Sequence, residues 1–476
     1  MNQGSSDRLA ADLRTWVAGA APGSRLPSTR ELTARHGASP VTVQKALRLL
    51  AAQGLIETRP GVGAFVRAAH HGRAHDYSWQ TAALGASVGV PVMTSTALRS
   101  PSPDVIALHS GYPDRDLLPE RLVRAALIRA ARSDAAVSRP ASEGLPELRS
   151  WFAAELGAQT PAGFAPPAPG DVLVTPGSQI ALGSVFRAVA GAGAVLLTES
   201  PTYWGAILAA AQVGVSLVPV PAGAEGPDLA ALDRALAQTG ARALYAQPSF
   251  ANPTGARWTP ATADAVRDLL RRHGAFLIED DWAHDFGIDA DAVPLAARDE
   301  DGHIVYLRSL TKSVSPAIRV AAVIARGPVR DRVLADLQAQ SMYVSGALQS
   351  AALDVLAQPA WRTHVRGVRA RLRVRRDLMI DAVRAHLPDA TIETIPAGGL
   401  NLWVRLPDGV DLARLSADGE ARGVVIASGR EWFPAEPTGA YVRLNYAGPD
   451  PGSFDAGIRL LAEALAEQRP SPRRPS

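Results

Sequence analysis

The chain has 476 residues, of which 47% are hydrophobic and 20% charged, with a formal net charge of +3; this length predicts two to four domains. The sequence contains no cysteine, which excludes disulfides and thiolate-bound metals. We expect a cytoplasmic protein with no membrane span, because the chain has neither the layout of a signal peptide nor an uncharged apolar stretch of about 18 residues.

Positive charge is concentrated at the N-terminal end. Residues 1–68 carry nine Lys or Arg and four acidic residues, a net charge of +5 that leaves −2 for the rest. Such a basic module is typical of a protein that binds nucleic-acid phosphates, although an ordinary solvated surface has a similar composition. Of the 49 basic residues only Lys45 and Lys312 are lysines. A lysine amine forms an imine with an aldehyde, whereas arginine does not. Lys45 and Lys312 are therefore candidates for imine formation, although the presence of either could also be accidental.

Residues 1–68 are predicted to form three helices and a β-hairpin. The apolar spacing of SDRLAADLRTWVAG predicts the first helix, and the capping box STRE begins the second. Ser39 followed by Pro40 begins the third helix. The segment LIETRPGVGAFV then predicts two strands joined by a tight turn. This is the layout of a winged helix, whose third helix enters the major groove of DNA.

The same residues resemble the GntR family of bacterial regulators, in PGSRLPSTRELTARHGAS and TVQKALRLLAAQGLIETRPGVGAFV. The resemblance implies DNA contacts from the second helix, the first turn of the third and the wing tip. Pro40 and Gln44 stand where members often carry arginine, so contacts are either fewer or made by Lys45 and Arg48. A helical bundle with no role in nucleic-acid binding is the alternative. The predicted DNA-binding residues are Arg30, Ser39, Thr42, Gln44, Lys45, Arg59 and Gly61.

The remainder of the chain is predicted to be one large domain between two irregular segments. Residues 69–103 are rich in His, Ser, Ala and Pro and form a predicted linker, and residues 468–476 a disordered tail. Residues 104–467 alternate apolar strands with helical stretches, which predicts an α/β domain with a mainly parallel sheet. The strands AVLLTES, ARALYAQP, GAFLIEDD and HIVYLRS end in or lead to polar residues, where open α/β sheets bind ligands.

Four side chains near these strand ends form one pattern: Tyr203, Asn252, Asp280 and Lys312. In this order they resemble the fold-type I pyridoxal-phosphate enzymes, particularly the class I and II aminotransferases, over about residues 105–465. The most specific motif is SLTKSVSPAIR, in which Arg319 follows the lysine by seven residues. The resemblance implies an α/β aminotransferase-like domain with a smaller C-terminal α+β subdomain.

The chemistry of pyridoxal phosphate explains these residue types. Lys312 forms the Schiff base with its aldehyde, and the carboxylate of Asp280 keeps its pyridine nitrogen protonated. The resemblance assigns ring stacking to Tyr203, a hydrogen bond to the phenolic oxygen to Asn252, and a substrate carboxylate to Arg443. The phosphate needs N–H groups, hydroxyls and an arginine. The candidates are Gly177, Ser178, Gln179, Ser309, Thr311 and Arg319.

The chain departs from the aminotransferase pattern at two positions. Trp282 stands where the family usually has a tyrosine that donates to the phenolic oxygen, and the sequence leaves open whether the indole N–H reaches so far. Arg139 stands near a tyrosine that reaches the partner subunit's phosphate, and it either serves that phosphate or lies on the surface. Both changes leave cofactor binding expected and argue against efficient turnover.

The whole chain resembles the MocR family, in which a GntR-type winged helix precedes an aminotransferase-like domain. The resemblance implies a homodimeric transcription regulator that binds a double-stranded DNA operator and holds pyridoxal phosphate. An amino acid, a related amine or the cofactor itself is the expected effector, with at most residual transaminase activity and no metal. One alternative is a catalytically active aminotransferase with an appended DNA-binding module. Another is a regulator that has lost the cofactor, which the intact Lys312, Asp280 and Arg319 oppose.

Overall fold

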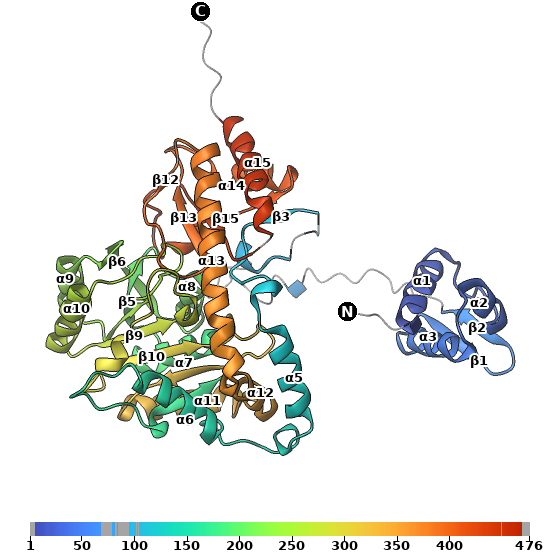
Figure 1. Cartoon of the computed structure of the whole chain (residues 1–476), viewed down its shortest axis with the longest axis horizontal. Helices are drawn as coiled ribbons and strands as arrows, with labels where there is room; N and C mark the ends of the chain where they lie inside the picture. Colours follow the sequence, from blue (N-terminus) through green and yellow to red (C-terminus); the bar gives the residue numbers. More distant parts are fainter. Residues whose placement is uncertain are drawn as a thin grey trace, which may run out of the picture. The chain divides into compact units, whose positions relative to one another are not determined.

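Two compact units, Met1–Ser87 and Val88–Ser476, make up the computed structural model of the chain (Figure 1). The structure describes residues 5–67, 79–80, 83, 95–100, 102, 104–448 and 450–468. Most of the predicted linker and nearly all of the predicted tail therefore lie outside the described residues. Within the described ranges we find no helix with the length and hydrophobicity that a membrane span requires.

Three helices and an antiparallel hairpin form the N-terminal unit, in the predicted order. These elements are α1 (Ser5–Gly19), α2 (Thr29–His36), α3 (Pro40–Ala52), β1 (Ile56–Arg59) and β2 (Gly63–Val66). The apolar sides of the helices and one end of the hairpin share a core. Its largest buried side chains are Leu9, Leu13, Leu26, Leu32, Leu50 and Ile56.

Side-chain caps begin α2 and α3. The Ser28 hydroxyl accepts a hydrogen bond from the Glu31 N–H at 3.2 Å, and the Glu31 carboxylate accepts one from the Ser28 N–H at 2.6 Å. The Ser39 hydroxyl accepts the Thr42 N–H at 3.1 Å, and Pro40 occupies the first turn of α3. The predicted capping box and N-cap are both confirmed.

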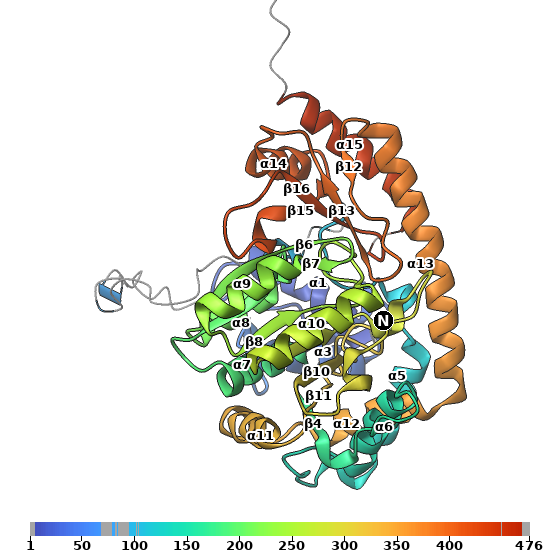
Figure 2. The same cartoon turned by 90° about the vertical axis from the view of Figure 1, so that its left-hand side faces the viewer.

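An eight-stranded sheet organises the larger unit (Figure 2). The strand order is β4-β11-β10-β9-β8-β5-β6-β7, and the strands from β10 to β6 run parallel. Strand β11 is antiparallel to both of its neighbours, and β7 is antiparallel to β6. The strands are β4 (Val172–Thr175), β5 (Val195–Ser200), β6 (Ser216–Gly223), β7 (Gly226–Pro227), β8 (Ala243–Ala246), β9 (Phe276–Asp281), β10 (Ile304–Ser309) and β11 (Ala321–Ile324).

Helices bury both faces of this sheet. In β8, Tyr245 belongs to one apolar core and Leu244 to the other, as the alternation of side chains along a strand requires. The core of Tyr245 includes α7 (Ser178–Val189), α8 (Trp204–Gln212) and α11 (Pro328–Ser341). The core of Leu244 includes α5 (Glu120–Ala131), α6 (Pro146–Gly157), α9 (Leu229–Thr239), α10 (Pro260–His273) and α12 (Gly346–Ala357). The predicted α/β class is confirmed.

A smaller α+β part follows the long helix α13 (Pro359–His386), which Figure 1 shows running along both parts of the unit. Its antiparallel sheet has the order β12-β13-β16-β15, and a separate pair joins β3 to β14 in parallel. The elements that follow α13 are β12 (Thr391–Ile392), β13 (Asn401–Arg405), α14 (Leu412–Ala421), β14 (Val424–Val425), β15 (Ala427–Ser428), β16 (Tyr441–Asn445) and α15 (Phe454–Ala466), and they are joined by β3 (Ile106–Ala107), which precedes the large sheet in the chain. Two 3₁₀ helices near the site are η1 (Thr96–Leu98) and η7 (Gly429–Trp432).

Candidate functional site

Four neighbouring parallel strands bring the predicted cofactor residues to one edge of the large sheet. Strands β10, β9, β8 and β5 are adjacent and run in the same direction. Tyr203 follows β5, Asn252 follows β8 and Lys312 follows β10, whereas Asp280 lies at the end of β9. These carboxyl ends are where open α/β sheets bind ligands.

Two aromatic rings and two charged side chains surround the amine of Lys312. Its Nζ lies 4.0 Å from the ring centroid of Trp282 and 5.8 Å from that of Tyr203. Burial lowers the pKa of Lys312 to about 7, because the attraction of Asp280 offsets burial only in part and Arg443 repels the charged form. A substantial share of the amine is therefore neutral, the nucleophilic form, near neutral pH.

The buried carboxylate of Asp280 has one oxygen in use. Its Oδ2 accepts hydrogen bonds from the Tyr245 hydroxyl and the Gln247 amide, each at 2.8 Å. Its Oδ1 has no hydrogen-bond partner among the described residues. Burial raises the pKa of Asp280, although these two donors and Lys312 oppose the shift. A cationic N–H donor facing Oδ1 would satisfy both the oxygen and the charge.

The sequence analysis did not identify Tyr245 and Gln247. In the parallel pairing of β8 with β9, Tyr245 lies opposite Ile278, so that Tyr245, Gln247 and Asp280 share a face of the sheet. The signal is present in ARALYAQP, where the two polar side chains stand two residues apart in an otherwise apolar strand.

Gly177 and Arg319 approach each other at the start of α7. Gly177 has a φ of +92°, and a Cβ at this position would lie 2.6 Å from Nη2 of Arg319. Only glycine allows this approach without displacing the guanidinium. Arg319 donates to the Pro176 carbonyl at 3.4 Å and itself has a φ of +49°. The free N–H groups of α7, from Ser178 onward, and this guanidinium are the donors that anion binding requires.

The other predicted phosphate-binding residues have different surroundings. The Ser309 hydroxyl accepts the Thr311 N–H at 3.4 Å, and the buried hydroxyl of Thr311 has no partner within the described ranges. Gln179 donates to the Gly205 carbonyl at 2.7 Å and accepts from the Tyr203 hydroxyl at 3.4 Å. A Cβ on Gly205 would lie 2.4 Å from the Tyr203 ring. Gln179 and Gly205 therefore fix the position of the Tyr203 ring.

Arg443 is fully buried and makes no hydrogen bond to a carboxylate among the described residues. Its guanidinium donates to the carbonyls of His109 at 2.6 Å and Ser110 at 3.1 Å, and to Oδ1 of Asn252 at 3.4 Å. Trp432 also donates to that Oδ1, at 3.2 Å, and its ring lies 4.7 Å from the guanidinium carbon. Burial lowers the pKa of Arg443 to about 10. Glu431 attracts this cation and offsets the effect of burial only in part, and among the described residues no carboxylate accepts a hydrogen bond from the guanidinium.

The two departures from the aminotransferase pattern have distinct environments. The indole N–H of Trp282 donates to the Phe250 carbonyl at 3.0 Å, and the side chain is 5% exposed. This donor is therefore already used by the protein. Arg139 is exposed on the chain surface.

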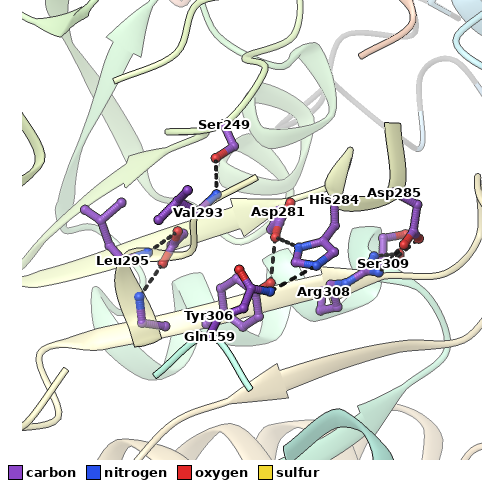
Figure 3. Close-up of polar contacts among 12 residues, drawn as sticks. Gln159, Ser249, Asp281, His284, Asp285, Val293, Leu295, Tyr306, Arg308 and Ser309 are labelled. Atoms are coloured by element: carbon purple, nitrogen blue, oxygen red, sulfur yellow. Dashed lines mark hydrogen bonds and ion pairs between the residues drawn. The ribbon is translucent and has the colours of Figure 1, made fainter. Parts of the chain in front are cut away.

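A network of polar side chains fixes β9 against β10 beside the candidate site (Figure 3). Oδ2 of Asp281 accepts the Tyr306 hydroxyl and pairs with Nδ1 of His284, each at 2.6 Å. Arg308 donates to both carboxylate oxygens of Asp285 at 2.9 Å. Burial alone would raise the pKa of Asp281, but His284, Arg308 and Tyr306 outweigh it and lower the pKa. The ionised carboxylate thus stabilises the strand pair.

In the N-terminal unit, the predicted DNA-binding residues lie on α2, at the start of α3 and on the wing. Thr42 is partly buried and shares a 2.9 Å hydrogen bond with the Ser39 hydroxyl. At the wing, Nε of Arg59 donates to Glu57 at 2.9 Å, and the guanidinium lies 4.7 Å from the Phe65 ring centroid. The exposed members of the set are Arg30, Ser39, Gln44, Lys45, Arg59 and Gly61.

Residues 103–459 match the family described as aminotransferase class I and II, and residues 5–66 match bacterial regulatory proteins of the gntR family. A 2-aminoadipate transaminase of Thermus thermophilus is 29% identical over 369 residues, covering 76% of this chain and 90% of that protein. The probable rhizopine catabolism regulatory protein MocR of Rhizobium meliloti is 27% identical over 454 residues, covering 93% of this chain and 89% of that protein. The solved structure of the alpha-aminoadipate aminotransferase LysN from Thermus thermophilus, complexed with N-(5'-phosphopyridoxyl)-L-leucine, has a TM-score of 0.71 and 28% identity, covering 77% of this chain and 93% of that chain.

These proteins differ in the share of the chain to which they are similar. The transaminase and the solved structure cover about three quarters of it, whereas the regulator also covers most of the remainder. Pyridoxal phosphate is the cofactor of the fold-type I aminotransferases. The predicted fusion is confirmed: the chain belongs to the aminotransferase class I and II family and, with its gntR-family winged helix, is a regulator of the MocR type.

Proposed function

We propose that this regulator senses an amino acid or a related amine that reacts with pyridoxal phosphate held at Lys312. The observation that carries the proposal is that the Lys312 amine, a buried carboxylate oxygen of Asp280 and the buried guanidinium of Arg443 lie at one site. Among the described residues the carboxylate oxygen has no hydrogen-bond partner, and the guanidinium donates to no carboxylate. Pyridoxal phosphate supplies an aldehyde for amine capture and a ring that withdraws electrons. The cofactor itself remains a second candidate for the signal.

The residues present fit the cofactor at each of its polar groups. Lys312 would hold the aldehyde, and Oδ1 of Asp280 would accept the pyridine N–H, for which the protein offers it no other donor among the described residues. Gly177, with the N-terminal N–H groups of α7, and Arg319 would hold the phosphate. Ser178, Gln179, Ser309 and Thr311 remain predicted phosphate contacts, Tyr203 the stacking ring and Asn252 the donor to the phenolic oxygen.

Arg443 supports a ligand that carries a carboxylate. A ligand carboxylate would supply the bidentate, negatively charged acceptor to which this buried guanidinium makes no hydrogen bond among the described residues. The similar transaminase and solved structure are named for 2-aminoadipate, and the latter contains a leucine adduct. An amino acid is therefore the ligand class that we propose.

We propose that the chain acts as a homodimer whose two winged helices bind spaced half-sites of an operator. Proteins of the aminotransferase family are commonly dimeric, which supports this assembly. The exposed side chains of α2, the first turn of α3 and the wing would contact the DNA. Amino-group transfer is expected to be residual, because the indole N–H of Trp282 is used by Phe250 and cannot also serve the cofactor.

The low number of lysines permits a direct test of the cofactor site. Borohydride reduction of the cofactor-loaded full chain should fix one pyridoxyl group, and peptide mass spectrometry should find it on Lys312. Lys312→Ala should abolish both this label and the visible absorbance of the bound cofactor. Lys45→Ala, which removes the other lysine, is the matched control and should retain both. A label on Lys45, or a colourless wild-type protein, would exclude the proposed site.

A second experiment separates regulator from enzyme. The full chain should bind the DNA upstream of its own gene, and deletion of residues 1–70 should abolish binding without loss of cofactor absorbance. Lys45→Ala and Arg30→Ala should weaken binding and reduce its salt dependence, since each removes a cation that can contact phosphate. Incubation with an amino-acid panel and 2-oxoglutarate should yield little keto acid. Rapid turnover would favour the aminotransferase alternative.

A further inference from the structure

The end of the segment that leads from the N-terminal unit is held by one glutamate of the larger unit. Glu431, in η7, accepts hydrogen bonds from the Ser95 hydroxyl at 2.5 Å and the Thr96 N–H at 3.1 Å, and from the Thr96 hydroxyl. Ser95 in turn caps η1 by accepting the Ala97 N–H at 3.2 Å. Both Ser95 and Ala97 are buried. We refer to Ser95, Thr96 and Glu431 as the linker clamp.

A second anchor holds the same segment three residues later. Arg99 donates to both carboxylate oxygens of Glu420, at 2.6 and 3.0 Å. The carbonyl of Arg99 lies 3.0 Å from Nε2 of His109, a side chain that is 1% exposed. His109 also provides the carbonyl that accepts from Arg443 at 2.6 Å. At this anchor a single residue, His109, therefore connects the segment to Arg443.

The linker clamp is also connected to Arg443 through η7. Trp432, the neighbour of Glu431, packs its ring against the Arg443 guanidinium at 4.7 Å. Strand β15, immediately before η7, pairs with β16 so that Ala427 lies opposite Arg443. Glu431 also attracts Arg443 electrostatically, and this attraction opposes the effect of burial on the arginine's pKa. One carboxylate therefore serves both the linker segment and the buried cation.

A ligand carboxylate would change the balance of charges at Glu431. A ligand carboxylate bound to Arg443 would neutralise the charge that now attracts Glu431. It would also place a second negative charge near the Glu431 carboxylate. Because the site is buried, this change is only weakly screened by salt. Within this cluster Leu98, Arg99 and Ser100 are exposed, so local opening is expected to begin at the η1 segment.

We propose that Glu431 couples ligand binding at Arg443 to the linker, so that a carboxylate on Arg443 loosens the linker clamp. This inference rests on the proposed function, since it requires a carboxylate ligand at the cofactor site. Glu431 is a positioning residue in this scheme. Coupling is reciprocal, so loss of the clamp must also alter the affinity for the carboxylate. Removal of the competing Glu431 charge should make carboxylate binding tighter.

Hydrogen exchange of the cofactor-loaded full chain tests the coupling, because the amides of residues 96–99 depend on the clamp and its η1 turn. The probes are L-leucine and 3-methylbutylamine, which differ only in the carboxylate. Both should change the cofactor spectrum. Leucine should accelerate exchange at residues 96–99 by about fivefold or more, and the amine should not.

Two variants distinguish coupling from a structural role. In Glu431→Gln, the amides of residues 96–99 should exchange rapidly without ligand, and leucine should no longer change their exchange rate. This variant should also bind leucine more tightly than wild type. Glu420→Gln, the matched control at the second anchor, should keep the response. If leucine changes the spectrum but not the exchange, or if the amine acts equally, the inference is wrong while the proposed function stands. If neither probe changes the spectrum, amine sensing fails and the inference with it.

Discussion

Replacement of Asp280 by asparagine separates the cost of a buried charge from its benefit to the cofactor. Oδ1 is buried and has no hydrogen-bond partner among the described residues, and burial raises the pKa of the carboxyl. A raised folded-state pKa means that this group stabilises the fold below its unfolded pKa, and that the contribution is lost as pH rises through the folded pKa. At neutral pH the cofactor-free Asp280→Asn chain should therefore unfold at the same temperature as wild type or higher.

With cofactor, the same substitution should be harmful. A hydrogen bond to a charged group contributes about 1.5–3 kcal/mol, and each 1.4 kcal/mol is about tenfold in affinity. Pyridoxal phosphate should therefore bind about 10- to 150-fold more weakly to Asp280→Asn than to wild type. Spectral titration measures this affinity, and thermal unfolding of the cofactor-free chain measures the stability.

The adjacent carboxylate is the matched control. Asp281 is equally buried, and its Oδ1 likewise has no hydrogen-bond partner among the described residues, but its Oδ2 pairs with His284 and Tyr306 and its pKa is lowered. Its stabilising effect is present above the unfolded pKa and lost as pH falls through the folded pKa. Asp281→Asn should thus lower the unfolding temperature at neutral pH, the opposite of Asp280→Asn. Unchanged cofactor affinity in Asp280→Asn, or equal stability changes in the two variants, would refute this reasoning.

Two further predictions concern cofactor capture. Because the pKa of Lys312 is lowered to about 7, the rate at which the protein captures pyridoxal phosphate should rise with pH up to about 7 and then level off. Stopped-flow absorbance measures this rate. A rate that still rises steeply above about pH 9 would indicate a lysine with an ordinary pKa. Gly177→Ala should weaken phosphate binding, so that the affinity for pyridoxal phosphate falls while the affinity for pyridoxal is unchanged. Gly163→Ala is the control, because Gly163 has a φ of +96° but open space around it. It should cost a similar backbone strain of about 1 kcal/mol and leave both affinities unchanged.

Sequence reasoning identified the parts of the site that follow from strand order. Tyr203, Asp280 and Lys312 could be predicted to meet because parallel neighbours end at one edge. The partners of Asp280 were equally within reach of the two-residue alternation in β8, although they were not identified. The hydrogen bonds of Gln179 could not be predicted, since they depend on side-chain rotation and on the backbone at Gly205.

Contacts between distant segments were beyond such reasoning. The linker clamp joins Ser95 and Thr96 to Glu431 across 335 or more residues, and no local pattern in either segment indicates the other. The same holds for Trp432 and Asn252. The large sheet sets the position of the predicted cofactor residues, whereas the fold of the C-terminal part sets what lies next to Arg443. Local periodicity predicts which residues lie at the strand ends, but it does not predict the neighbours of Arg443.

The sequence left open what the indole N–H of Trp282 contacts, and the structure answers this with one hydrogen bond. The effect of replacing Trp282 follows from that hydrogen bond. The indole N–H is used by the buried Phe250 carbonyl, while the ring face lies 4.0 Å from Nζ of Lys312. Trp282→Phe keeps an aromatic face but leaves that carbonyl unpaired, which should cost about 1–3 kcal/mol of folding free energy, with a further loss for the smaller ring. The affinity for pyridoxal phosphate should change by much less than the stability, because the lost donor is bonded to the Phe250 carbonyl. If the spectrum and affinity of the bound cofactor instead shift strongly while stability is kept, the indole N–H must turn toward the cofactor, and the argument for weak amino-group transfer would be lost.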